Sequence, residues 1–175
     1  MPDFDLDTWL PDPAIRTRHR RVADGATPEA LWAAAGALRV DETGPLGRVV
    51  RWRIPGLPAD VTFRELFASP PFTVLAEGDG WSVSGLAGRI WTLRRDYPQL
   101  EDARAFAAWA QPGTVRVLFA HWVEGAALVS EARVAPVDRG AALRLRALWT
   151  VVGPAERLIG GEALGRVTRR ATLDR

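Results

Sequence analysis

Cysteine is absent from this 175-residue sequence, which excludes disulfide bonds, thiolate nucleophiles and cysteine-based metal sites. Histidine is nearly as scarce, because the chain contains only His19 and His121, far apart in the sequence. Two distant histidines do not by themselves supply the three or four protein ligands of a zinc site. A P-loop, a dinucleotide-binding fingerprint and an H-E-x-x-H motif are also missing. We therefore expect neither a metal ion nor a cofactor, and no motif assigns a catalytic residue.

Lysine is missing too, so all 23 basic residues are arginines. The formal net charge is only +2, yet the isoelectric point is near 10.2, because arginine stays protonated above about pH 12. The high isoelectric point is therefore a weak sign of a nucleic-acid partner, and we expect none. The lack of lysine and asparagine beside abundant alanine, glycine, arginine and proline favours a GC-rich bacterial genome.

Long apolar runs are missing as well, since none reaches the roughly 18 residues that a membrane-spanning helix needs. The chain starts with Asp3, Asp5 and Asp7, unlike the basic start of a secretory signal peptide. These features predict no integral membrane segment and a cytoplasmic location.

What the sequence does contain is typical of one globular domain, with 47% hydrophobic and 25% charged residues. Residues 1–13 are rich in proline and aspartate, which predicts an N-terminal arm. Residues 14–175 are expected to form a single domain.

Two capping signals predict short helices after a first strand at residues 15–23. Thr27 is a good N-cap because a proline and a glutamate follow it. Thr62 begins a capping box that Glu65 completes. Between these helices, residues 46–54 fit a strand or a helix, and the pattern leaves both alternatives open.

The dipeptide Asp79-Gly80 lies between two alternating runs and predicts a hairpin over residues 72–86. Alternation places Val74, Trp81 and Val83 on one face of this hairpin. The middle of the chain is completed by three further predicted segments: a turn at 85–88, a strand at 89–94 and a helix at 102–110.

The last hairpin carries the most informative pattern of the chain. Pairing about residues 125–126 places His121 opposite Ser130 and Phe119 opposite Ala132. Since this face holds the apolar set, it must be the buried one, and both His121 and Ser130 are expected to point inward. A slip of one residue would reverse this conclusion.

The opposite face of the last hairpin carries Trp122 among charged neighbours. An outward apolar patch there predicts a homodimer contact, or a cover formed by the N-terminal arm. The C-terminal helix has an apolar stripe that includes Trp149, and Pro154 interrupts the helical pattern.

The order of these elements and several sequence segments resemble the START-like superfamily, which includes Bet v 1 and the polyketide cyclases. The segments are His19 followed by Thr27-Pro28-Glu29, Gly85-Leu86-Ala87-Gly88-Arg89-Ile90-Trp91, Pro112-Gly113-Thr114 and Ser130-Glu131-Ala132-Arg133-Val134. The resemblance implies an α+β helix-grip fold, in which a curved antiparallel sheet wraps around a long C-terminal helix, with two short helices after the first strand. It also implies a cavity that holds lipids, sterols, polyketides or aromatic compounds. Ser130 and Ala132 replace threonines of the superfamily pattern, which removes a hydroxyl from the presumed inner face.

We therefore expect the chain to bind a small apolar or aromatic ligand between the sheet and the C-terminal helix. His121 and Ser130, with Arg53 near the cavity mouth, are expected to hold the polar end of the ligand. The expected walls are hydrophobic side chains: Trp81, Val83, Phe119 and Trp149. The alternative is an enzyme of the polyketide cyclase or aromatase type that uses His121 in the same cavity. A core histidine satisfied by a hydroxyl or a backbone group is the competing interpretation of His121.

Overall fold

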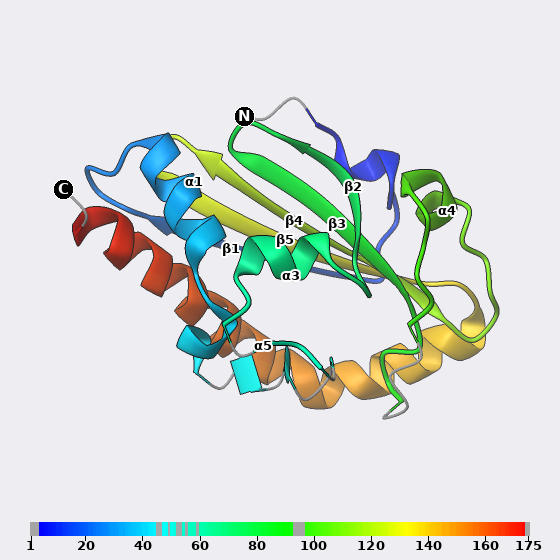
Figure 1. The fold of residues 1–175 in the computed structure, drawn as a ribbon. Helices are drawn as coiled ribbons and strands as arrows, with labels where there is room; N and C mark the ends of the chain where they lie inside the picture. The colour runs from blue at the N-terminus through cyan, green and yellow to red at the C-terminus, as the bar shows by residue number, and fades with distance from the viewer. Residues whose placement is uncertain are drawn as a thin grey trace.

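The structure is a computed structural model that describes residues 4–44, 47–48, 50–51, 54, 56–58, 60–92 and 97–173, apart from the side chains of residues 151, 154–163, 172 and 173. It is an α+β molecule built on one open antiparallel sheet of five strands, in the order β1-β5-β4-β3-β2 (Figure 1). The strands are β1 (Ile15–Val22), β2 (Thr73–Gly78), β3 (Trp81–Gly88), β4 (Val115–Glu124) and β5 (Ala127–Pro136). We call the side of the sheet that packs against the long C-terminal helix the helix face, and the opposite side the arm face.

The last hairpin has the register that the sequence predicts. His121 of β4 lies opposite Ser130 of β5, and Phe119 lies opposite Ala132. Gly125 has a φ of 59°, which glycine adopts without a steric penalty and which permits the tight turn between the strands. Because side chains alternate along a strand, these four residues all lie on the helix face.

The first hairpin forms around Asp79-Gly80, but its register contains an irregularity. Ala76 pairs with Val83, whereas Val74 pairs with Ser84, because a bulge separates Val74 from Ala76. The expectation that Val74 and Val83 share a face is therefore wrong. The extra residue of a bulge changes the side to which the preceding side chains point.

The segment after the first hairpin also differs from the prediction. β3 continues through residues 85–88, where the sequence predicts a turn, and residues 89–92 form no strand. Gly85 has a packing role instead of a turning role, because a Cβ atom there would lie 2.6 Å from the ring of Phe106. Phe106 belongs to α4 (Ala103–Ala107), which packs against β2 and β3. Glycine therefore permits the close approach of a helix to a strand.

Three helices cover the helix face: α1 (Pro28–Ala37), α3 (Phe63–Ala68) and the 35-residue α5 (Arg139–Leu173) (Figure 1). The first two begin at the predicted caps. Thr27 accepts a hydrogen bond from the Ala30 amide at 3.2 Å, and Thr62 forms a reciprocal capping box with Glu65. α5 continues as a helix through Pro154, so the proline does not end it.

Between α1 and α3 lies the short 3-10 helix η2 (Val40–Thr43). Within the ambiguous residues 46–54, the described residues with regular structure are helical, at positions 47, 48, 50 and 51. The structure therefore favours the helix alternative there. No helix in the described part of the chain combines the length and the apolar character required to cross a lipid bilayer.

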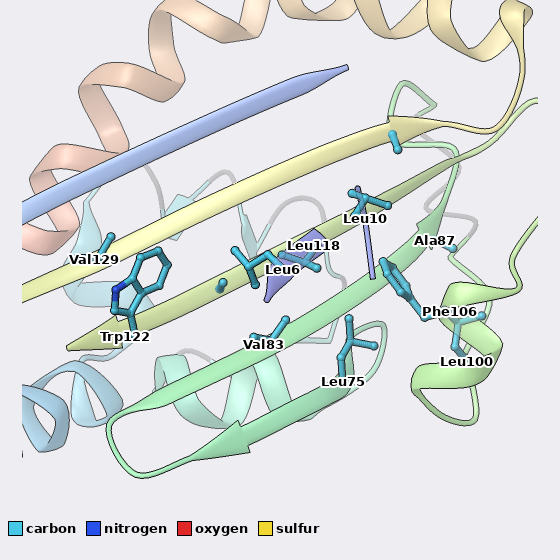
Figure 2. Close-up of a cluster of buried hydrophobic side chains, with 12 residues drawn as sticks. Leu6, Leu10, Leu75, Val83, Ala87, Leu100, Phe106, Leu118, Trp122 and Val129 are labelled. Carbon is cyan, nitrogen blue, oxygen red and sulfur yellow. The ribbon is translucent and has the colours of Figure 1, made fainter. Parts of the chain in front are cut away.

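The arm face is covered by the N-terminal segment, which includes the 3-10 helix η1 (Leu6–Thr8), and by α4. Figure 2 shows a continuous cluster of 12 buried residues there, in which Leu6 and Leu10 lie over the central strands with Leu118 and Val83. Leu10 has no exposed surface. The N-terminal arm is therefore a cover on the sheet, one of the two alternatives that the sequence allows.

A buried network of charges fastens this arm to β5. Arg133 binds Glu131 at 2.7 Å and the Leu10 carbonyl at 3.1 Å, and it also forms an ion pair with Asp7. Arg16, on the neighbouring strand, contacts the same glutamate at 2.8 Å. Glu131 is only 1% exposed, so its two arginine partners compensate the loss of water around its charge.

Candidate functional site

The buried core of the helix face is divided into three clusters. One cluster packs α1 and the end of α5 against Leu128, and it includes Leu31 and Leu164. A second cluster packs Leu145 of α5 against strand residues such as Val117. A third lies around Val40, Val61 and Leu66, and Phe67 of α3 packs against it. Along β4 and β5, the positions between the first two clusters are only partly buried, and we call this stretch, over which Phe67 lies, the interruption.

A row of polar side chains crosses the sheet at this interruption. Four strands contribute to it through direct cross-strand pairing: Ser82 of β3, His121 of β4, Ser130 of β5 and His19 of β1. Directly opposed residues have Cβ atoms about 5 Å apart, so each side chain is within reach of its neighbour or of a bridging group. We call these four residues the polar row.

An aromatic group lies beside the polar row. The Phe67 ring of α3 has its centre 4.8 Å from the His121 ring and 5.3 Å from the Phe119 ring. Phe72 contacts both Phe67 and Phe119, at 5.0 and 5.7 Å. All three phenylalanines retain partial exposure. We call Phe67, Phe72 and Phe119 the aromatic wall.

The position of this wall follows from local structure. The capping box of Thr62 and Glu65 starts α3, and α3 then carries Phe67 one helical turn later. Ser84 donates a hydrogen bond from its hydroxyl to the Phe67 carbonyl at 3.0 Å, which ties the end of α3 to β3. The helix end and the strand are thus held together, and the ring of Phe67 lies over His121.

His121 has an unmet hydrogen-bonding requirement. Its Nε2 atom is enclosed and has no hydrogen-bond partner among the described residues. Burial lowers the pKa of His121 to about 4, so the imidazole is neutral near pH 7. An unsatisfied buried polar atom typically costs about 1–3 kcal/mol, and a bound molecule could recover this cost.

Two of the predicted wall residues lie on the other side of the sheet. Trp81 pairs with Trp122, and Val83 pairs with Ala120, so all four point to the arm face. Phe4 of the arm packs against Trp81, with ring centres 4.8 Å apart. The expectation that Trp81 and Val83 line a cavity with His121 is therefore wrong. Because residues 89–114 separate β3 from β4, no tight turn fixes their relative register.

The other predicted site residues are less closely defined. Trp149 follows Leu145 by one turn of α5, is partly buried, and has its ring against Gly153. It therefore lies on the same side of α5 as a core residue. Arg53 lies outside the described residues, so its predicted contact with a ligand stays a prediction.

Trp122 does not form the exposed patch that the sequence predicts for a homodimer. It is 6% exposed, with Phe4 packed edge-on at 5.7 Å and the Arg18 guanidinium 5.0 Å from its ring. The arm of the same chain therefore occupies the surface proposed for a second copy.

Sequence reasoning missed Ser82 and His19 as members of the row. The sequence does not indicate to which side of the sheet His19 points, because both sides of β1 carry polar residues. The pairing of β1 with β5 and of β3 with β4 places them beside Ser130 and His121. The sequence pattern could have placed Ser82 beside His121 only if the pairing register between β3 and β4 had been known.

A separate groove of about 400 Å³ lies between α1 and the end of α5. It is lined mainly by alanines of α1, with Arg170 and Ala171 from α5. None of the predicted site residues lines it. Arg170 is also engaged with Glu42 at 3.4 Å, so the groove offers few polar contacts.

Among the described residues, no group of three histidine, aspartate or glutamate side chains is arranged to hold a metal ion. The fold and the site define an α+β protein whose open antiparallel sheet is covered by α1, α3 and α5 on one face and by the N-terminal arm and α4 on the other. A comparison with protein-family models, with curated proteins and with solved structures found no match for this chain.

Proposed function

We propose that this protein binds a small, mostly apolar or aromatic molecule on the helix face, between the sheet and α5. The observation that carries this proposal is the partly buried interruption at His121, whose Nε2 atom is enclosed without a hydrogen-bond partner among the described residues. A bound molecule that reaches this atom would satisfy it. Ser130, directly opposite His121, is the second group expected to hold the polar end.

The surroundings of the polar row suit a flat apolar molecule. The aromatic wall offers ring faces and edges, and aromatic pairs at such distances contribute about 0.5–1.5 kcal/mol beyond area burial. Small-molecule sites combine a mainly apolar lining with a few placed polar groups. Phe119, His121 and Ser130 provide this combination on adjacent strands, and Trp149 lies on the helix that would close the site.

The helix-grip arrangement and the START-like resemblance belong to this proposal. In chain order, β1 is followed by a helical segment that includes α1, η2 and α3, then by β2, β3, α4, β4 and β5, and finally by the long α5. That order supports the resemblance, which implies ligand binding between sheet and helix. Fold alone does not define a reaction, and the site residues have to carry the functional argument.

The enzyme alternative receives less support than binding. A polyketide cyclase or aromatase would need His121 to move a proton. A histidine with a pKa near 4 is a weak base at neutral pH, because effective acid–base groups have a pKa near the working pH. We therefore assign His121 a role in orienting the ligand.

Binding of N-phenyl-1-naphthylamine, a neutral fluorescent probe, tests the proposal. The wild-type protein should bind the probe. Ala132→Phe should abolish binding, because Ala132 lies opposite Phe119 and the added ring would occupy the proposed site beside it. Val22→Phe is the matched control, since Val22 is 49% exposed at the end of β1. Equal binding by wild type and Ala132→Phe, with both variants folded by circular dichroism, would contradict a site at this place.

A further inference from the structure

The polar row differs from the rest of the sheet in the chemistry of its groups. It consists of two serine hydroxyls and two imidazoles, and the Nε2 atom of the central imidazole, His121, is enclosed without a hydrogen-bond partner in the part of the chain that the structure describes. Resting on the proposed function, we propose that the ligand presents a neutral oxygen group, a hydroxyl or a carbonyl, to His121. Carboxylates and ammonium groups would be excluded from this position.

The first reason is the absence of charge at the centre of the row. The imidazole of His121 is neutral near pH 7, so it offers an ionised ligand no opposite charge. Moving an ionised group from water into an enclosed position is costly unless a counter-charge meets it there. A neutral oxygen has a much smaller desolvation cost and can still hydrogen-bond.

The second reason is that three of the four arginines of β1 are engaged on the arm face. Arg16 contacts Glu131 at 2.8 Å, and Arg20 contacts Glu124 at 3.6 Å. Arg18 lies over the Trp122 ring at 5.0 Å. All three therefore interact with residues of the arm face and do not serve the polar row. Arg21, the fourth, lies opposite Leu128 on the helix face and is exposed to solvent.

The third reason is the hydrogen-bonding capacity of a hydroxyl. In a neutral imidazole one nitrogen donates and the other accepts. A ligand hydroxyl satisfies Nε2 in either case, because it can donate or accept, whereas a carbonyl satisfies it only when Nε2 carries the proton. The serines on both sides of His121 can likewise donate or accept. A hydroxyl on an aromatic ring is the group that suits the row best.

Calorimetric titration with naphthalene, 2-naphthol and 2-naphthoate at pH 7 tests this inference. The three probes share one ring system, and at this pH the phenol is neutral and the carboxylate ionised. We expect 2-naphthol to bind about tenfold more tightly than either of the others, the factor that corresponds to one well-made hydrogen bond.

Substitutions at the row assign the preference to His121. His121→Leu should bind naphthalene and 2-naphthol equally, and His121→Gln, which retains a hydrogen-bonding group, should keep a two- to fivefold preference. If His121→Leu does not fold, Ser130→Ala replaces it, with an expected two- to threefold loss of the preference. Tightest binding of 2-naphthoate would overturn the inference. An undiminished preference for 2-naphthol in His121→Leu, or in Ser130→Ala where that variant replaces it, would overturn it too.

The same titrations separate the two proposals. If naphthalene and 2-naphthol bind equally to the wild-type protein, the inference about the oxygen group is wrong while apolar binding stands. If none of the three probes binds, the proposed function fails with it. Loss of 2-naphthoate binding in Arg53→Gln, together with a wild-type preference for 2-naphthoate, would instead support an anionic ligand.

Discussion

The two faces of the sheet have opposite packing. On the arm face, one continuous cluster of 12 residues is closed by the N-terminal arm and α4, and central positions such as Leu118 and Ala120 have no exposed surface. On the helix face, the buried residues form separate clusters, and the positions at the polar row remain partly exposed. The three helices therefore cover the helix face less completely than the N-terminal arm and α4 cover the arm face.

Polar groups follow the same division. On the arm face, Glu131 and Arg133 bind each other and further partners, so buried charges are compensated. On the helix face, the Nε2 atom of His121 has no partner within the described part of the chain. The first arrangement compensates the charges that folding buries, whereas the second leaves a buried polar atom unsatisfied. The two faces thus differ in how completely their buried polar groups are paired, and the proposed ligand would remove this difference.

The largest expected effect compares one aromatic residue from each face. Phe106→Ala should lower the free energy of unfolding by about 4 kcal/mol, because Phe106 is fully buried against Gly85. Phe119→Ala should cost about half as much, since Phe119 is partly exposed beside the polar row. Urea unfolding measures both values. Equal losses would show that the two faces are packed equally well.

Breaking the buried charge pair should have the next largest effect. Arg133→Met leaves Glu131 without one partner, and we expect a loss of about 3 kcal/mol by urea unfolding. The double variant Glu131→Leu with Arg133→Met should recover much of this loss, because no charge is then left buried. If the double variant is less stable than Arg133→Met, the attraction between Glu131 and Arg133 contributes more to the free energy of unfolding than the burial of their charges costs.

The pH dependence of stability should reveal the neutral imidazole of His121. Its pKa is lowered from about 6.5 to about 4, so between these values the unfolded state binds the proton more readily. Stability from this source is fully present above about pH 6.5 and is lost as the pH falls towards 4, by about 3 kcal/mol in total. Thermal melting of wild type and His121→Leu measures it. The difference between their pH profiles should vary over this interval, and a constant difference would argue against a buried neutral histidine.

The smallest effect concerns the edge of the arm. Phe4→Ala removes ring contacts with Trp81 and Trp122, and we expect a loss of about 1 kcal/mol. The same variant should leave probe binding on the helix face unchanged. A large fall in probe affinity would mean that the ligand occupies the arm face, which would reverse the comparison between the faces.

Local signals in the sequence predicted the elements that short-range interactions define. The caps at Thr27 and Thr62 and the register of the last hairpin are confirmed, because each depends on residues only a few positions apart. The turn predicted at 85–88 failed for a long-range reason. Gly85 lacks a side chain so that Phe106 can approach, and nothing near it in the sequence shows this.

The part of the candidate site that local patterns define was predicted from the sequence, and the part that depends on pairing between distant strands was not. His121, Ser130 and Phe119 share one face because the period-two pattern of a single hairpin places them there. Trp81 and Val83 were assigned to the wrong face because their strand meets β4 only through tertiary pairing. An apolar pattern also identifies the buried face only when the other face is open to water, and here both faces are covered.

The sequence by itself determined the alternation along each strand, the helix starts and the absence of cysteine chemistry, since these follow from residue type and nearest neighbours. Tertiary structure alone decided which strands lie side by side, how the arm closes one face, and that the Nε2 atom of His121 is buried without a hydrogen-bond partner among the described residues. Those outcomes depend on contacts between segments far apart in the chain, whose register no local pattern specifies.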